Sequence, residues 1–129
     1  MNNDNELIKG LEATRKWSRQ SALLGKRARF CCEYCGLDFL VSVENYKLWQ
    51  VDHIVPTCSG GDPTDFDNLA VACKVCNWDW KNRWDPRSAA GENASREALI
   101  QAVREHIRFR KSRTDEELAL VRRIVGYDP

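Results

Sequence analysis

The sequence predicts a small α+β domain, in which two short strands and a helix surround a four-cysteine metal site and helical segments flank this core. Three observations predict this class. All six cysteines fall within residues 30–87, together with three of the four prolines and four of the five tryptophans. The same part holds the turn sequence Ser-Gly-Gly-Asp-Pro at 59–63. Apolar residues recur at helical spacing before and after this part.

The order of elements follows from these patterns. Residues 7–24 carry a weak apolar stripe and are expected to form one helix, with Gly25 as its stop. We expect strands near 48–51 and 69–72 and a helix that begins around Cys76. We divide the chain into a basic N-terminal helical arm (1–27), a core (28–87) and C-terminal helices that pack on the core (88–129).

Two helices are expected at the C-terminal end. Ser95 can cap the first, whose apolar residues recur at 99, 103 and 107. Thr114 and Glu117 have the spacing of a capping box and predict the start of the second helix. Apolar residues follow at 118, 121 and 125, and Gly126 closes this helix.

Composition excludes several classes of protein. With 43% hydrophobic and 30% charged residues, the chain is expected to be globular rather than disordered. Its longest apolar run, 69–73, is too short to span a membrane, and the N-terminal residues lack the features of a secretory signal. We therefore expect a cytoplasmic protein without membrane contact, in which six cysteines favour a metal site over disulfides.

Charge is informative only in its distribution, because the net charge is +1. Residues 13–30 carry six basic side chains and no acidic one, and 104–113 carry five basic side chains with Glu105 alone against them. Such patches can bind phosphates, although solvated helix faces are commoner. We expect phosphate contacts from Arg15, Lys16 and Arg19.

The cysteines give the strongest chemical signal. Cys32-x-x-Cys35 and Cys73-x-x-Cys76 form two knuckles that can deliver four thiolates to one Zn²⁺. A four-thiolate site has no open position, so we expect structural zinc rather than a catalytic metal or a redox dithiol. Cys58 is interpreted as a free thiol. Cys31 is interpreted in the same way, with an alternative role as a ligand beside Cys32.

Between and beside the knuckles lie Asp52-His53-Ile54-Val55-Pro56, Asp67-Asn68-Leu69 and Asn77. Carboxylate and amide oxygens suit Mg²⁺ or Mn²⁺, and a neutral imidazole can accept a proton from water. Such a set suits metal-assisted phosphodiester hydrolysis. Each residue also has a purely structural explanation, as a turn acceptor, a buried imidazole or a helix cap.

The order and spacing of these elements resemble the HNH endonuclease family, whose ββα-metal core is often wrapped around a four-cysteine zinc site. The resemblance covers about residues 28–87. It implies a DNA endonuclease that leaves 5′-phosphate and 3′-hydroxyl ends. It also implies that His53 is the general base and that Asn68 orders the loop and orients that base. Asp52 and Asn77 would bind the catalytic Mg²⁺ or Mn²⁺.

One position departs from the family pattern. Many members place a lysine three residues after the equivalent of Asn77, where this chain has Trp80 and the lysine follows at 81. On an α-helix Lys81 would face about 100° away from that position. We therefore expect phosphate contacts from Lys81 or from the nearby Arg83 and Arg87. The tryptophans at 78, 80 and 84 could stack on bases or close the core.

Two other interpretations stay open. The chain could be a non-catalytic, zinc-stapled nucleic-acid-binding module with a degenerate site, or an interaction protein whose terminal helices bind a partner. The sequence is compatible with a monomer or a homodimer. His106 has no partner in the sequence and is expected at the surface or between helices.

Overall fold

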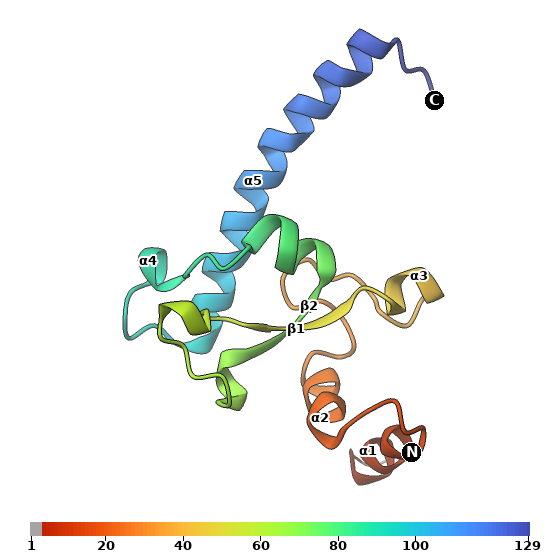
Figure 1. The fold of residues 1–129 in the computed structure, drawn as a ribbon, viewed down its shortest axis with the longest axis vertical. Helices are drawn as coiled ribbons and strands as arrows, with labels where there is room; N and C mark the ends of the chain where they lie inside the picture. Colours follow the sequence, from red (N-terminus) through yellow and green to blue (C-terminus); the bar gives the residue numbers. More distant parts are fainter. Residues whose placement is uncertain (1–3) are drawn as a thin grey trace.

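A two-stranded antiparallel sheet lies at the centre of the computed structural model, which describes residues 4–129 (Figure 1). Strand β1 (Trp49–His53) pairs with β2 (Leu69–Cys73), with Trp49 opposite Cys73 and His53 opposite Leu69. Both predicted strands are confirmed. Every residue of β2 is buried, as its continuous apolar run requires. In β1 the side chains alternate, so Gln50 and Asp52 share the face opposite to that of His53.

A loop and a helix complete the unit around the sheet. The connection from β1 to β2 contains the short turns η1 (Thr57–Ser59) and η2 (Phe66–Asn68). After β2 the chain forms η3 (Val75–Lys81), which begins close to the predicted Cys76. This segment is a π-helix, with one residue more per turn than an α-helix. Its last turn closes with the amide of Asn82 donating to the Asn77 carbonyl.

The N-terminal arm differs from the single helix predicted over 7–24. The structure has α1 (Asp4–Ala13) and α2 (Arg19–Arg27), because Arg15 adopts a left-handed φ of 61° and Ser18 caps a new helix by accepting from the amide of Ser21. Gly25 does not stop α2 but lies within it. A Cβ at Gly25 would lie 2.6 Å from the Phe30 ring, so glycine allows the arm to approach the core closely.

Aromatic side chains join the arm to the core. The indole of Trp17 donates to the hydroxyl of Tyr46 at the end of α3 (Val43–Tyr46), and its ring packs edge-on against Trp49 at 4.8 Å between centroids. Phe39, which is fully buried, also packs edge-on against Trp49, with 5.1 Å between ring centroids. These contacts fix α1 and α2 beside the first residue of β1.

The C-terminal part is one long helix and not the two that the sequence predicted. After the short α4 (Arg87–Ala90), α5 runs without interruption from Arg96 to Val125. Ser95 caps it and Gly126 ends it in a left-handed conformation, as predicted. Thr114 does not cap a helix, because residues 108–117 contain no glycine or proline that would break the preceding turns.

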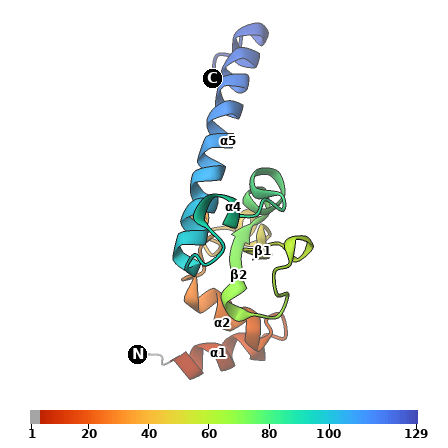
Figure 2. The same ribbon diagram turned by 90° about the vertical axis from the view of Figure 1, so that its left-hand side faces the viewer.

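Only the first half of α5 packs on the core. Ile100, Val103 and Ile107 are buried against η3 and the sheet, whereas every residue from 108 to 129 is exposed. Figures 1 and 2 both show the second half projecting alone beyond the core. The predicted stripe at 99, 103 and 107 therefore packs, and the predicted stripe at 118, 121 and 125 does not. Among residues 4–129, no helix has the length and apolarity needed to cross a membrane.

Candidate functional site

The four predicted cysteine ligands converge at one end of the sheet. The Sγ atoms of Cys32, Cys35, Cys73 and Cys76 all lie within 4.8 Å of one another, and those of Cys35 and Cys73 are 3.8 Å apart. Tetrahedral zinc with Zn–S bonds of about 2.3 Å requires sulfur atoms ~3.8 Å apart. The cluster is therefore positioned for a zinc site, as the sequence predicted, and Cys31 is not one of its members.

Backbone amides point at these sulfurs. The amides of Cys35 and Cys73 donate to the Sγ of Cys32 at 3.4 and 3.2 Å, and the amide of Cys76 donates to the Sγ of Cys73 at 3.4 Å. Hydrogen bonds of this kind favour the thiolate form that binds metal. The hydrogen bond with the Cys32 thiol lowers the pKa of Cys35 below its ordinary value. Fold and donor chemistry both fit a closed, four-thiolate zinc site.

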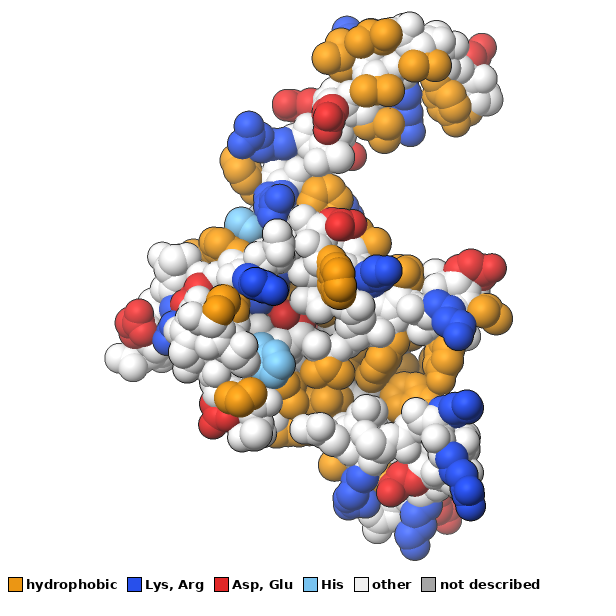
Figure 3. Space-filling view, viewed as in Figure 1, with side chains coloured by type: hydrophobic (Ala, Val, Ile, Leu, Met, Phe, Trp, Pro, Cys, Tyr) orange, Lys and Arg blue, Asp and Glu red, His pale blue; other side chains and the backbone are white. Residues whose placement is uncertain are grey.

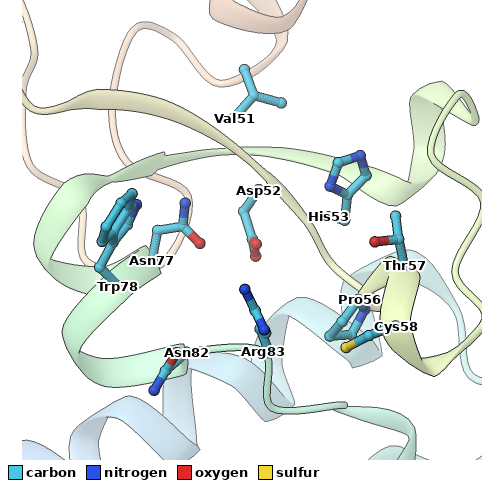
Figure 4. A pocket seen from close by; sticks show the side chains of 10 residues that line it. All are labelled: Val51, Asp52, His53, Pro56, Thr57, Cys58, Asn77, Trp78, Asn82 and Arg83. Carbon is cyan, nitrogen blue, oxygen red and sulfur yellow. The ribbon is translucent and has the colours of Figure 1, made fainter.

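A second site lies on the neighbouring surface, as a cavity of about 550 Å³ between β1, η1 and η3 (Figure 4). Of the predicted residues it brings together Asp52, His53, Asn77 and Arg83. It does not include Asn68, Lys81, Arg87 or the arm residues Arg15, Lys16 and Arg19. The cavity is lined by Val51, Asp52, His53, Pro56, Thr57, Cys58, Asn77, Trp78, Asn82 and Arg83.

Asp52 is buried at the back of this cavity, and one of its oxygens is already engaged. Its Oδ2 accepts from the hydroxyl of Tyr34 at 2.7 Å and from the ammonium of Lys81 at 3.1 Å. Burial, and then the Asp52 carboxylate, raise the pKa of Tyr34 well above its usual value, so the hydroxyl stays protonated and donates. Within residues 4–129 the Oδ1 atom has no hydrogen-bond partner and is left for a ligand.

Asn77 extends from η3 and is also held by a hydrogen bond that leaves one of its oxygen atoms free within residues 4–129. Its amide Nδ2 donates to the side-chain oxygen of Gln50 at 2.8 Å, which leaves the amide oxygen unbonded among the described residues. Figure 4 shows this oxygen turned toward the Asp52 carboxylate. Sequence reasoning missed Gln50, although it lies two residues before Asp52 and therefore on the same face of β1. The two free oxygens fit a hard divalent cation such as Mg²⁺ or Mn²⁺.

The side chain of His53 projects from the face of β1 opposite to that of Asp52, but it lines the same cavity. Its Nε2 lies 3.3 Å from the carbonyl oxygen of Pro63. A carbonyl only accepts, so Nε2 carries the proton in this contact and a neutral ring then has its lone pair on Nδ1. Within the described chain Nδ1 has no partner. Pro63 was also missed, although the turn sequence at 59–63 marked the loop that carries it.

Asn68 lies outside the cavity and holds that loop in place. Its side chain donates to the carbonyls of Val55 at 3.0 Å and Asp62 at 3.1 Å, and it accepts from the amide of Val55 at 2.9 Å. Gly61 makes the close approach possible, because a Cβ there would lie 1.9 Å from the Val55 carbonyl oxygen. Asn68 therefore fixes Asp62, and the next residue, Pro63, contacts His53.

The sequence predicted a phosphate contact from Lys81 or its basic neighbours, but the structure turns the Lys81 side chain into the core. Its side chain is fully buried, and its ammonium donates to the Asp52 carboxylate and to the His53 carbonyl, both at 3.1 Å. The π-helical geometry of η3 is the reason. An extra residue in the turn returns position 81 to the inward face, where an α-helix would have placed position 80.

The two other basic residues after η3 differ from each other. Arg83 is exposed, and Figure 4 shows its guanidinium pointing up from the floor of the cavity toward Asp52. Arg87 is instead engaged with Asp85, which it contacts through both carboxylate oxygens, and it also donates to the Ser59 carbonyl. The hydrogen bonds with Asp85 raise the pKa of Arg87. Its charge is matched, so the structure does not favour Arg87 as a phosphate ligand.

The basic arm lies apart from the cavity. Arg15 and Lys16 are exposed in the turn between α1 and α2, and Arg19 is 3.8 Å from Glu12. Arg27, in the same basic run, donates to the carbonyl of Phe66 at 3.0 Å and so serves the fold. Figure 3 shows basic side chains gathered on this end of the molecule, on the face that also shows a histidine.

Trp78 is 62% exposed at the rim of the cavity, so it does not close the core. Trp84 does pack inward and stacks on His106 with 4.0 Å between ring centroids. Burial, and then Arg110, lower the pKa of His106, which lies between α5 and the segment after η3. Cys58 is exposed and lines the cavity.

Comparison with known families agrees with this geometry. Residues 32–83 match the model of the HNH endonuclease family, which confirms the resemblance over these residues. The match begins at Cys32, the first cysteine of the cluster, and ends at Arg83, so it includes both the cysteine cluster and the cavity. Searches of curated proteins and of solved structures gave no match to the chain.

Proposed function

Because residues 32–83 form an HNH domain, we propose that this protein is a metal-dependent endonuclease that hydrolyses DNA phosphodiester bonds. One observation carries the proposal. Asp52, Asn77 and His53 line a single cavity, and each has one atom (Oδ1, Oδ1 and Nδ1) without a partner in the described chain. None of the three is a buried, unsatisfied atom, so each is open to the cavity and to a ligand there.

Asp52 and Asn77 are the residues that would hold the catalytic cation. When bound, Mg²⁺ or Mn²⁺ would stabilise the negative charge that develops on the scissile phosphate and on the departing 3′ oxygen. Tyr34 and Lys81 fix the carboxylate of Asp52, and Gln50 fixes the amide of Asn77, so both oxygens are oriented before a metal arrives.

His53 is the general base in this proposal. Donation from Nε2 to the Pro63 carbonyl orients the ring, and in the neutral ring this tautomer places the lone pair on Nδ1, which can take the proton of the attacking water. Asn68 acts through the loop and is a positioning residue, because it holds the carbonyl of Asp62 beside Pro63.

Substrate contacts would come from the floor and the rim of the cavity. Arg83 is exposed with its guanidinium at the floor of the cavity and suits a phosphate oxygen. Trp78 presents an exposed indole beside Asn77, on which a base next to the cleaved bond could stack. Since phosphate contacts carry no sequence information, we expect weak sequence specificity.

The test is cleavage of supercoiled plasmid in the presence of Mg²⁺, Mn²⁺ or EDTA. Activity with either metal and none with EDTA supports the proposal. Asp52→Ala and Asn77→Ala should abolish most activity, with partial recovery at higher metal concentration. Cys58→Ser changes another cavity-lining side chain and should cut like the wild type. Metal-independent DNA binding without any cleavage would favour the non-catalytic nucleic-acid-binding module.

A further inference from the structure

The second half of α5 exposes an apolar surface that nothing in the described chain covers. From 108 onward every residue is exposed, and Figure 3 shows orange side chains spread over this projecting end. An isolated helix of this length is marginal in water, and large exposed apolar patches usually mark an interface. The exposed apolar side chains are Phe109, Leu118, Leu120, Val121, Ile124, Val125 and Tyr127.

This surface repeats the part of α5 that packs on the core. Five turns of an α-helix take 18 residues, and residues separated by 18 positions therefore face the same direction. Leu118, Val121 and Val125 lie 18 positions after Ile100, Val103 and Ile107. The first three side chains of this stripe are buried, and the second three are 43–72% exposed. The core-packing face thus continues past the end of the core.

The charges beside the exposed stripe are complementary between two antiparallel copies of the helix. An acidic block, 115–117, precedes the midpoint at residue 119, and the basic pair 122–123 follows it. Asp115 and Arg122 are seven positions apart and flank the same side of the stripe. Two such helices side by side and antiparallel would bring Asp115 of each copy near Arg122 of the other. In a parallel pair the two cores would lie at the same end, each on the stripe side of α5, and would collide.

We propose that this protein self-associates through residues 111–125 of α5, as an antiparallel pair of helices related by a two-fold axis near residues 119–120. Leu118 of each copy then packs against Val121 of the other, and Val125 packs near Thr114. From Ile107 to the axis is about 12 residues, or ~19 Å of helix, so the two cores lie at opposite ends and do not collide. The proposal is independent of the proposed nuclease activity.

A shallow hollow supports this mode of packing. Tyr127 folds back over the end of α5, because its amide donates to the Arg122 carbonyl at 2.9 Å. Together with Leu118, Val121 and Val125 it lines a concavity of about 260 Å³ on the exposed stripe. Such a hollow is suited to receive one apolar side chain from a facing helix.

The experiment is sedimentation equilibrium of the zinc-loaded full chain over a wide concentration range. The wild type should shift from the monomer mass of 14.9 kDa toward twice that mass as concentration rises. Val121→Glu should weaken association at least about 10-fold, because it inserts a charge into the apolar contact. Leu120→Glu is the matched control. Leu120 is 49% exposed against 47% for Val121 but faces away from the stripe, and its variant should associate like the wild type.

A charge-reversal pair tests the orientation. Asp115→Arg and Arg122→Asp should each weaken association, and the double variant should restore it, because the antiparallel pairing is recreated. Zinc content and far-UV circular dichroism should be unchanged in all variants, since none touches the core. A wild type that stays monomeric up to about 1 mM would overturn the proposal. So would equal effects of Val121→Glu and Leu120→Glu, or a double variant as weak as the single ones.

Discussion

The cysteine cluster and the Asp52–Asn77 pair are neighbours in the chain, yet they differ in each property that governs metal chemistry. Cys76 and Asn77 are consecutive residues of η3. The cluster offers four soft sulfur atoms within 4.8 Å, and three of its four residues are buried. The pair offers two hard oxygens at the wall of an open cavity of about 550 Å³.

This difference suits the cysteine cluster to stabilising the fold and the Asp52–Asn77 pair to chemistry. Four thiolates complete a tetrahedral zinc site, so the cluster has no position for water or substrate. Two oxygens leave most of the coordination positions of a divalent cation open to water and to a phosphate. One turn of η3 thus connects a site suited to hold the fold with a site suited to react. If the two sites have separate roles, variants at one should leave the property that depends on the other unchanged.

The largest effect is expected from Cys73→Ser. The cluster joins the segment before β1 to the end of β2, and metal-binding free energy is folding free energy in small zinc domains. The variant should lose both bound zinc and its cooperative unfolding transition, measured by atomic absorption and circular dichroism. Cys58→Ser, at an exposed cysteine outside the cluster, should keep both. A metal-free Cys73→Ser protein that melts like the wild type would refute a structural role for zinc.

His53→Ala should abolish most DNA cleavage but leave the protein folded. Loss of a general base lowers rates by roughly 10²–10⁴-fold. Zinc content and DNA affinity should be unchanged, and added Mg²⁺ or Mn²⁺ should not restore cleavage, because no cation replaces a proton acceptor. Plasmid cleavage by His53→Ala at the wild-type rate would show that another group is the base.

Lys81→Met tests the buried ion pair between Lys81 and the Asp52 carboxylate at the back of the cavity. It leaves the Asp52 carboxylate buried without its cation, and such a loss costs about 3 kcal/mol of unfolding free energy. Urea unfolding of the zinc-loaded protein measures it. The double variant with Asp52→Asn should recover much of the stability, because the unpaired charge is gone. A Lys81→Met variant as stable as the wild type would show that the ion pair is not needed for the fold.

Asn68→Asp should have a smaller effect, confined to the cavity. The aspartate can still accept from the Val55 amide but cannot donate to the carbonyls of Val55 and Asp62. With two hydrogen bonds lost, each worth about 1 kcal/mol, we expect cleavage to fall by up to about 30-fold and the zinc cluster to stay intact. The measurement is the rate at saturating metal. If Asn68→Asp lost zinc, the two sites would be coupled rather than separate.

The smallest effect is expected from the arm, which lies outside both sites. Changing Arg15, Lys16 and Arg19 together to alanine should flatten the log–log salt dependence of DNA binding by up to about 0.9 per lost phosphate contact. The cleavage rate at saturating DNA should be unchanged. Lys26→Ala is the control, because Lys26 pairs with Asp4 and its charge is already matched. An unaltered slope for the triple variant would place the arm away from DNA.

Local patterns were sufficient to predict the elements of the site. The two knuckles, the alternation in β1 and the apolar run of β2 are short-range features, because spacing along the chain decides which way each side chain faces. The cysteine cluster and both strands followed from them. The order of the motifs was enough to indicate the family that residues 32–83 match.

Other features depend on residues that are distant in sequence, and only the tertiary structure decided them. The inward turn of Lys81 required a π-helix, which is compatible with the same residues as an α-helix and places Lys81 beside Asp52 and Tyr34. The break between α1 and α2 brings Trp17 to Tyr46 and Trp49. The apolar stripes of α5 are alike in sequence, but one is buried and the other exposed because the core ends near Ile107. Periodicity identifies an apolar face, but only the surrounding chain determines whether that face is covered.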